Sequence, residues 1–338
     1  MKKYNVGILG ATGAVGQEMV KVLQERKFPV DNLRLFASSR SAGKEVKFNG
    51  ESVFIEEAKE DSKLYEGLEI VLGALDNDLA KKMIPNVVKA GAVVIDNSSA
   101  YRLDDNVPLV VPEVNPDDTF KHKGIIANPN CATIIGLVAI NELNRHNKIK
   151  RLTVSTYQAV SGAGAGGIVE LDEQIKALLN NAKIVCNIFP YQIAYNLIPQ
   201  IGSFNELGYS SEEMKFQNEG RKIIHNPDLM VSCTCIRVPV YRSHSEAITI
   251  EFENDIEPDD AKKLLAKADG VKLVDDLENK KYPMPLDSSD QDLVFVGRIR
   301  RDISRNDKKG LVLWCCGDQI RKGAASNAVQ IAELLIKK

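Results

Sequence analysis

A cysteine at the start of an apolar segment is the residue best placed to act as a nucleophile. Cys131 follows the loop residues Asn128, Pro129 and Asn130, and the segment from Cys131 to His146 has the length and apolar content of a buried helix. Unpaired N–H groups and the positive end of a helix dipole favour thiolate over thiol, which predicts a lowered pKa and a reactive sulfur. Cysteine is also among the most buried residue types, so position alone leaves a structural role equally open.

Polar and ionisable residues recur in three later segments, STYQAVSGAGAGG, NEGRKI and IRVPVYRSHSEA, the first of which contains Gln158. Glu219 and Lys222 are three residues apart on a predicted helix, so a carboxylate and an ammonium share one face. Arg237 and His244 are seven residues apart, which places them on opposite faces of a continuous strand unless a bend brings both into a cleft. A salt-bridged helix face or a solvated strand end explains each of these residues taken alone.

A glycine-rich segment near the N-terminus, VGILGATGAVG, lies where a first predicted strand, Tyr4–Leu9, gives way to a first predicted helix, Val15–Arg26. Backbone amides and the helix dipole at such a junction can hold a pyrophosphate, and glycine lets the backbone approach it. The spacing of Gly10, Gly13 and Gly16 departs by one residue from the commoner dinucleotide fingerprint, and a tight turn is the alternative. The place of the segment in the predicted fold favours dinucleotide binding.

The end of the second predicted strand lacks the acidic residue that usually binds the ribose hydroxyls of NAD. The segment Ala37–Ser41 reads ASSRS and includes Arg40. Arginine supplies planar, charge-assisted donors for a 2′-phosphate, and no carboxylate stands beside it to repel the anion. The segment therefore favours NADP over NAD, with a solvated loop arginine as the alternative.

The composition is that of an ordinary globular chain and excludes several other classes. With 338 residues, 44% hydrophobic and 27% charged, two domains are expected and disordered or fibrous chains are excluded. A formal net charge of -2 provides no global field for nucleic acid or anionic lipid. The longest apolar stretch, Cys131–Ile140, falls far below the roughly 18 residues that span a bilayer. The N-terminus lacks the pattern of a secretory signal, so we expect a cytoplasmic protein.

Six cysteines in a chain without an export signal predict free thiols rather than a disulfide framework. The pairs Cys233/Cys235 and Cys315/Cys316 lack the two-residue gap of a zinc site. We therefore expect no metal site and interpret these four cysteines as buried small hydrophobic residues.

Strand and helix patterns alternate in the first part of the chain, which predicts an α/β domain with a Rossmann-like, doubly wound parallel sheet. The predicted elements are the strands Tyr4–Leu9, Leu33–Phe36, Ile70–Gly73, Val93–Asp96 and Ile125–Ala127, and the helices Val15–Arg26 and Asp78–Ala90.

Longer, alternating strands follow the helix at Cys131–His146 and predict an α+β domain with a mixed sheet. The strands are expected at Leu152–Ala159, Leu229–Pro239, Ala247–Phe252 and Leu293–Ile299, and the helices at Gly167–Asn180 and Ser211–Ile224. A last amphipathic helix, Gly323–Lys338, is expected to pack back on the first domain. The predicted domains are residues 1–128 with 318–338, which bind NADP, and residues 129–317, which hold the catalytic and dimerisation functions.

Seven motifs occur in order along essentially the whole chain: GATGAVG, SSAYR, NPNC, TYQAVSGAGAGG, NEGRKI, RVPVYRSHSEA and GDQIRKGAASNA. Together they resemble the aspartate-semialdehyde dehydrogenase family in the form found in many bacteria. The resemblance implies an NADP-dependent enzyme that interconverts aspartyl 4-phosphate with aspartate 4-semialdehyde and phosphate. It also implies a place in the biosynthesis of lysine (through diaminopimelate), threonine and methionine, and a homodimer.

The resemblance implies a role for each residue that matches a family motif. Cys131 is implied as the nucleophile that forms an acyl-thioester, His244 as its acid/base and Gln158 as the residue that orients the intermediate. Arg237 is implied to grip the substrate carboxylate and Glu219 to face the amine. The implied phosphate-binding residues are Arg102 and Lys222, and the implied cofactor-binding residues are Thr12, Gly13, Ala14, Val15, Arg40, Ser41, Ser161, Gly162 and Gln319.

In the implied reaction the thiolate displaces phosphate, a hydride from NADPH reduces the thioester, and an imidazole with a pKa near neutrality moves the protons. The nearest alternative enzyme is N-acetyl-γ-glutamyl-phosphate reductase, which shares this chemistry. Asn130 and the amine-facing Glu219 favour the aspartyl substrate, because an acetylated amine carries no charge to pair. The alternative from another class is a catalytically silent NADP-binding sensor, against which the presence of Cys131 and His244 counts.

Overall fold

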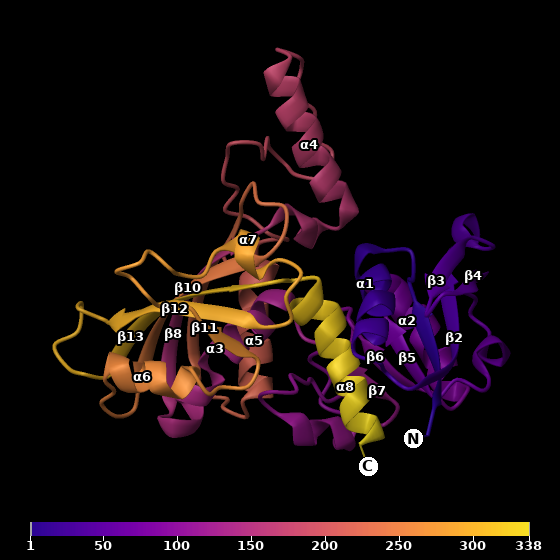
Figure 1. Cartoon of the computed structure of the whole chain (residues 1–338), viewed down its shortest axis with the longest axis horizontal. Coiled ribbons are helices and arrows are strands. Elements are labelled where there is room, and N and C mark those ends of the chain that lie inside the picture. Colours follow the sequence, from indigo (N-terminus) through magenta and orange to yellow (C-terminus); the bar gives the residue numbers. More distant parts are fainter. Residues whose placement is uncertain (1, 338) are drawn as a thin grey trace. The chain divides into compact units, whose positions relative to one another are not determined.

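The computed structural model describes residues 2–337 and separates them into two compact units (Figure 1). The first unit comprises the chain up to Asn130 and resumes at Ala324, and the second is Cys131–Gly323. Each unit is organised around one sheet, with seven strands in the first and six in the second. Both sheets contain parallel and antiparallel pairs, and the α/β and α+β classes predicted from the sequence are confirmed.

The first sheet is parallel except for one hairpin and has the order β3-β4-β2-β1-β5-β6-β7. Its central strand, β1, pairs with β2 on one side and with β5 on the other, so the strand order reverses at β1. Ligands of doubly wound sheets bind at the carboxyl ends of the strands next to such a reversal. The strands are β1 (Tyr4–Leu9), β2 (Val30–Ala37), β3 (Glu45–Phe48), β4 (Glu51–Glu57), β5 (Ile70–Gly73), β6 (Val93–Asp96) and β7 (Ile125–Ala127).

Three helices cover the two faces of this sheet: α1 (Ala14–Glu25), α2 (Asn77–Lys89) and α8 (Ser326–Ile336). Apolar side chains of α1 and α8, among them Met19 and Val329, are buried together with Val6 and Ile8 of β1. A separate cluster joins α2 to the opposite face. The last helix of the chain therefore completes the core of the unit that the first residues begin.

The second sheet is mixed and has the order β11-β12-β13-β10-β8-β9. Its outer pairs β8–β9 and β11–β12 are parallel, and the strands between them are antiparallel. The strands are β8 (Ile149–Gln158), β9 (Met230–Arg237), β10 (His244–Phe252), β11 (Val271–Leu273), β12 (Val294–Arg301) and β13 (Gly310–Gly317). The helices α3 (Cys131–His146), α5 (Ser211–Ile223) and α6 (Pro258–Leu265) pack on one face, and the short helix α7 (Pro285–Ser288) precedes β12.

The register of four strands aligns residues in rows across this sheet. Gln158 pairs with Arg237, His244 pairs with Gly317, and the pairing of Ser245 with Tyr157 puts His244 beside Gln158. One end of the sheet therefore presents a guanidinium, an amide and an imidazole side by side. The next row inward on the same buried face consists of Cys235, Thr156, Glu246 and Cys315.

A further helix of the second unit, α4 (Ala165–Leu179), stands clear of the sheet and is tied to the chain that follows it (Figure 1). The Glu170 carboxylate accepts the backbone N–H groups of Asn187, Ile188 and Phe189 at 2.8, 2.5 and 3.2 Å. One turn later, Gln174 accepts two more N–H groups of the same segment. The helix thus holds this segment through polar side chains that it buries.

Replacing Glu170 with Ala removes the acceptor of three backbone N–H groups. Asn187 and Ile188 are exposed, so water partly replaces the lost acceptor. At about 1 kcal/mol net for each hydrogen bond, we expect the free energy of unfolding to fall by about 3 kcal/mol. Urea denaturation measures the loss, and limited proteolysis locates it, with new cleavage expected in residues 182–198. Glu173→Ala, an exposed carboxylate on the same helix, is the matched control. An equal loss in that control contradicts the assignment.

Candidate active site

Four residues predicted for chemistry lie together at one end of the second sheet. Cys131 is the first residue of α3, and its Sγ lies 3.4 Å from Nε2 of His244. His244 begins β10, while Gln158 and Arg237 end β8 and β9. The chain leaves the sheet between Arg237 and His244, which confirms the bend that their odd spacing required. Three strand ends and one helix start therefore converge on a sulfur atom.

The surroundings of His244 fix both its tautomer and its charge. Its Nδ1 accepts the backbone N–H of Ala159 at 3.1 Å, so the neutral ring carries its proton on Nε2, the nitrogen that faces Cys131. Complete burial, followed by the nearby Arg237, lowers the pKa of His244 to about 3, and Glu212 opposes this shift. The expected pKa near neutrality is therefore wrong, because the sheet removes this ring from water. At neutral pH His244 is an uncharged donor.

The side-chain amide of Gln158 is held at both ends. Its Oε1 accepts the hydroxyl of Thr156 at 3.0 Å, and its Nε2 donates to the carboxylate of Glu212 at 3.1 Å. The same Nε2 lies 3.3 Å from Nε2 of His244. Sequence reasoning missed Glu212, which lies in the first turn of α5 and whose other oxygen pairs with Lys215. The only signal was a pair of acidic residues behind a serine that caps a helix.

Arg237 is buried at the end of β9 and has few ways to move. Its Nη1 donates to the carbonyl of Ala159 at 2.7 Å, and burial lowers the pKa of its guanidinium. Gly162 packs against it: a Cβ there lies 2.7 Å from Nη1 of Arg237 and 3.1 Å from Cε1 of His244. Any residue larger than glycine at this position displaces one of the two side chains.

Two further residues predicted for the cofactor, Ser161 and Gln319, lie beside this centre. Gln319 donates to the hydroxyl of Ser161, and its Oε1 accepts the backbone N–H of Ser243 at 2.8 Å. Gly323 follows on the same segment, where a Cβ is 2.8 Å from Cβ of Cys131 and 3.4 Å from Cβ of Gln319. The segment after β13 therefore closes one side of the site around the sulfur.

The two residues predicted on α5 lie on its inner side. Glu219 is buried, two turns after Glu212 on the same face of the helix, and Lys222 three residues later is half-buried. The face that carries both carboxylates also buries Phe216 and Ile223 against the sheet. Helix α5 thus offers two acidic groups to the interior of this unit.

In the first unit, a cavity of about 430 Å³ lies where β1 gives way to α1. Gly10 has a φ of +78°, and a Cβ there lies 2.3 Å from the carbonyl oxygen of Ala74, so the turn requires glycine. The predicted Thr12 and Gly13 line the cavity, and Ala14 and Val15 follow as the first residues of α1. The other lining residues are Gly10, Ala37, Ser38, Ser39, Ala58, Ala74, Leu75, Asp76, Leu79 and Met83.

Two serines after β2 line this cavity, and an arginine follows them in sequence. Ser38 and Ser39 line it, and Arg40 and Ser41 follow in the short turn Ser39–Ser41, where Arg40 is exposed. A dinucleotide fits this cavity if its phosphates face the N-terminus of α1, where the glycines lie. The two serines and the turn Ser39–Ser41 would then lie near its other groups. The cavity wall of apolar residues fits the base of such a ligand.

The loop before Cys131 is anchored within the first unit by a ladder of amides. Asn128 donates to Oδ1 of Asn97 at 2.7 Å, and Asn327 of α8 donates to Oδ1 of Asn128 at 2.7 Å. Arg102, buried in the same unit, donates from Nη2 to the carbonyl of Asn97 at 2.8 Å. The two predicted phosphate-binding residues thus belong to different units, Arg102 to the first and Lys222 to the second.

The described residues contain neither a metal-binding cluster nor a membrane-spanning helix. No group of three or more His, Cys, Asp or Glu within residues 2–337 is arranged to hold a metal ion. Over the same residues, no helix is both long enough and apolar enough to cross a membrane.

Known proteins resemble the chain over both units. Two family models match it: "Semialdehyde dehydrogenase, NAD binding domain" over residues 5–122 and "Semialdehyde dehydrogenase, dimerisation domain" over residues 141–322. The aspartate-semialdehyde dehydrogenase of Aquifex aeolicus is 49% identical over 338 residues, which cover 99% of this chain and 98% of the relative. Such identity over the full length places the chain in one family.

Solved structures give the same result. Aspartate semialdehyde dehydrogenase II of Vibrio cholerae, complexed with ASA, matches with a TM-score of 0.96 and 45% identity, covering 100% of this chain and 99% of that chain. Aspartate semialdehyde dehydrogenase of Candida albicans, with NADP, matches with a TM-score of 0.75 and 26% identity, covering 99% of this chain and 98% of that chain. The fold of each unit is thus that of solved relatives.

The lowered pKa of His244 makes part of the stability depend on pH. The unfolded chain binds a proton at this residue below about pH 6.5, whereas the folded chain binds it only near pH 3. The contribution of the neutral His244 ring to the free energy of unfolding is therefore complete above pH 6.5. It is lost as the pH falls below that value, by up to about 1.4 kcal/mol per pH unit. We expect the difference in unfolding free energy between wild type and His244→Asn to shrink with this slope. Parallel curves, or a ring that titrates near pH 6.5 by NMR, contradict the prediction.

Proposed function

The chain belongs to the aspartate-semialdehyde dehydrogenase family, and from that premise we propose that it interconverts aspartyl 4-phosphate with aspartate 4-semialdehyde and phosphate, using NADP. The observation that carries the proposal is the 3.4 Å distance between Sγ of Cys131 and Nε2 of an uncharged His244. Gln158 and Arg237 lie in the same row of the sheet as His244. Its place in metabolism is the biosynthesis of lysine through diaminopimelate, threonine and methionine.

The first step is attack of the Cys131 thiolate on the acyl phosphate. A sulfur–carbon bond forms, the carbon–oxygen bond to phosphate breaks, and phosphate leaves; Arg102 and Lys222 are the residues whose charges would bind it. The Nε2–H of His244 faces the sulfur and stabilises it as thiolate by donating to it. This neutral donor supports the nucleophile without needing a positive charge on the ring.

The second step reduces the thioester and releases the aldehyde. When bound, NADPH supplies the hydride. The residues of this chain hold the reacting groups: Gln158 orients the intermediate, and the Nε2–H of His244 donates a hydrogen bond to its oxyanion, which collapses to the aldehyde as the carbon–sulfur bond breaks and the thiolate is restored. Ser161, Gly162 and Gln319 border the same centre, which supports their role at the reactive end of the cofactor.

Substrate recognition uses Arg237 for the carboxylate and Glu219 for the amine. A guanidinium binds a carboxylate through two parallel hydrogen bonds, and burial strengthens that contact. N-acetyl-γ-glutamyl-phosphate reductase, the alternative enzyme, is disfavoured by full-length identity to aspartate-semialdehyde dehydrogenases. A silent NADP-binding sensor is disfavoured by the contact between Cys131 and His244.

The choice of NADP is supported by Ser38 and Ser39, which line the first unit's cavity, and by the exposed Arg40 that follows them. Hydroxyls and a guanidinium suit a 2′-phosphate. The structure of the Candida albicans relative contains NADP. Thr12, Gly13, Ala14 and Val15 would hold the pyrophosphate, and Arg40 with Ser41 the 2′-phosphate.

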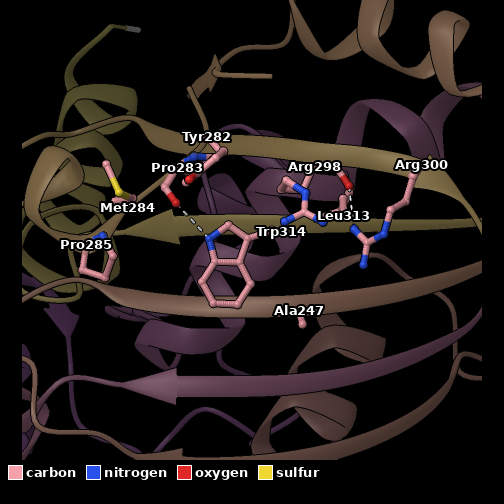
Figure 2. Close-up of a pocket in the computed structure, with 9 residues that line it drawn as sticks. All are labelled: Ala247, Tyr282, Pro283, Met284, Pro285, Arg298, Arg300, Leu313 and Trp314. Atoms are coloured by element: carbon pink, nitrogen blue, oxygen red, sulfur yellow. Dashed lines mark hydrogen bonds between the residues drawn. The ribbon is translucent and has the colours of Figure 1, made fainter. Parts of the chain in front are cut away.

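A homodimer accounts for the open face of the second sheet. Opposite α3, this face carries Tyr157 and Trp314, whose ring centroids are 5.4 Å apart. Figure 2 shows Trp314 lying over the strands and donating to the carbonyl of Pro283 beside a cavity of about 340 Å³. Because the matching family model is a dimerisation domain, we assign this face to the partner subunit. The other cavity residues are Ala247, Tyr282, Met284, Pro285, Arg298, Arg300 and Leu313.

Replacing Cys131 with Ala tests the covalent step. We expect formation of NADPH from aspartate 4-semialdehyde and phosphate to fall to background, because no other group can form the thioester, while NADP still binds by calorimetry. Cys186→Ala, which removes the exposed cysteine, should keep both the activity and its sensitivity to thiol alkylation. Turnover by purified Cys131→Ala, or an assay that needs no phosphate, contradicts the proposal.

Replacing Arg237 with Lys tests recognition of the carboxylate. An ammonium keeps the charge but loses the two parallel hydrogen bonds, so kcat/KM should fall by about 100-fold or more while the melting temperature changes little. Steady-state kinetics and a thermal melt measure the two quantities. If kcat/KM of Arg237→Lys is close to that of the wild type, Arg237 does not bind the substrate carboxylate.

A further inference from the structure

The Gln158 amide has two chemically different ends, and its neighbours decide which end faces the reaction. On one side the Thr156 hydroxyl touches Oε1, and a hydroxyl can either donate or accept. On the other side Glu212 touches Nε2, and an ionised carboxylate can only accept. Glu212 is therefore the neighbour that distinguishes the two orientations of the amide.

The orientation matters because His244 stands next to the same amide. The ring carries its proton on Nε2, since Nδ1 is taken by the N–H of Ala159. The Gln158 and His244 nitrogens, 3.3 Å apart, are therefore both donors and do not bond to each other. Gln158 uses one hydrogen on Glu212, and its second remains for the space beside Cys131, where the His244 proton also points.

With the amide turned over, this arrangement is lost. Oε1 would then lie beside Nε2–H of His244 and accept its proton, while the amide nitrogen would donate to Thr156, whose hydroxyl can accept. Both donors would be consumed within the protein. The inverted orientation is excluded because it brings Oε1 against the Glu212 carboxylate, where two acceptors repel.

Glu212 is itself firmly placed. It is 7% exposed, lies in the first turn of α5, where a carboxylate is favoured by the helix dipole, and its second oxygen pairs with Lys215 Nζ at 2.8 Å. The next residue, Glu213, closes the capping box with Ser210 and accepts the backbone N–H of Cys235 at 3.0 Å. The start of the helix is thus fastened to β9, the strand beside Gln158.

We propose that Glu212 is a positioning residue that keeps the N–H end of Gln158 toward the reacting oxygen. Gln158 and His244 then supply two side-chain donors to the oxyanion that forms when the thiolate adds to the acyl phosphate. Donors fixed in advance at the place where charge develops lower the barrier to its formation. The inference rests on the proposed function and gives it a residue outside the matched motifs.

The test compares Glu212→Ala, Glu212→Gln and Lys215→Met in the phosphate-dependent assay. We expect Glu212→Ala to lower kcat by about 100-fold at an unchanged KM, because a misplaced donor fails only in the transition state. Glu212→Gln should recover most of the rate, since its amide oxygen still accepts from Gln158. Lys215→Met, the matched control, removes the ion pair of Glu212 but not its contact with Gln158 and should stay close to wild type.

A double-mutant cycle shows whether Glu212 acts through Gln158. If it does, Gln158→Ala/Glu212→Ala is no slower than Gln158→Ala alone. Multiplying losses, or a Glu212→Gln variant whose main change is a raised KM, overturns the inference in favour of direct contact between Glu212 and the substrate. Thermal melts identify variants that do not fold. If Glu212→Ala does not fold, Glu212→Gln is the variant that tests the inference. An inactive wild type counts against the proposed function, whereas an active wild type with an equally fast Glu212→Ala counts against this inference alone.

Discussion

One hydrogen bond, from the backbone N–H of Ala159 to Nδ1 of His244, sets the state of the whole site. It exists because the register of β8 and β10 brings the end of one strand against the start of the other. It leaves the ring proton on the nitrogen that faces Cys131, and burial keeps the ring uncharged. The site therefore presents an uncharged hydrogen-bond donor to the sulfur of Cys131.

The positions of the remaining groups follow from the same sheet. Two rows run across β9, β8, β10 and β13: a guanidinium, an amide and an imidazole lie at the edge, and two thiols, a hydroxyl and a carboxyl lie beneath them. In that inner row neither Glu246 oxygen has a hydrogen-bond partner, and burial raises the pKa of this carboxyl well above its ordinary value. Burial thus favours the neutral form of this carboxyl, in the row beneath Gln158 and His244.

Local pattern predicted much of the fold, and long-range contact explains what it missed. The helix at Cys131–His146 matched in both bounds, because a long apolar run with a loop before it specifies a buried helix. The β3–β4 hairpin was missed although its turn contains Asn49 and Gly50, both with positive φ and typical of tight hairpins. Strand β13 was also missed, because the adjacent Cys315 and Cys316 are both buried and interrupt the alternation of half-buried and buried residues.

Contacts between residues far apart in the sequence also escaped prediction in the candidate site. Glu212 lies 54 residues from Gln158, and no spacing rule connects them.

The first unit likewise depends on its distant last helix, since α8 buries Val329 and Ala332 in its core. The second unit is one continuous segment, whereas the N-terminal strands of the first unit are made long before the helix that completes their core. For this chain, early synthesis and early folding are separate events, because those strands expose apolar surface until α8 is available.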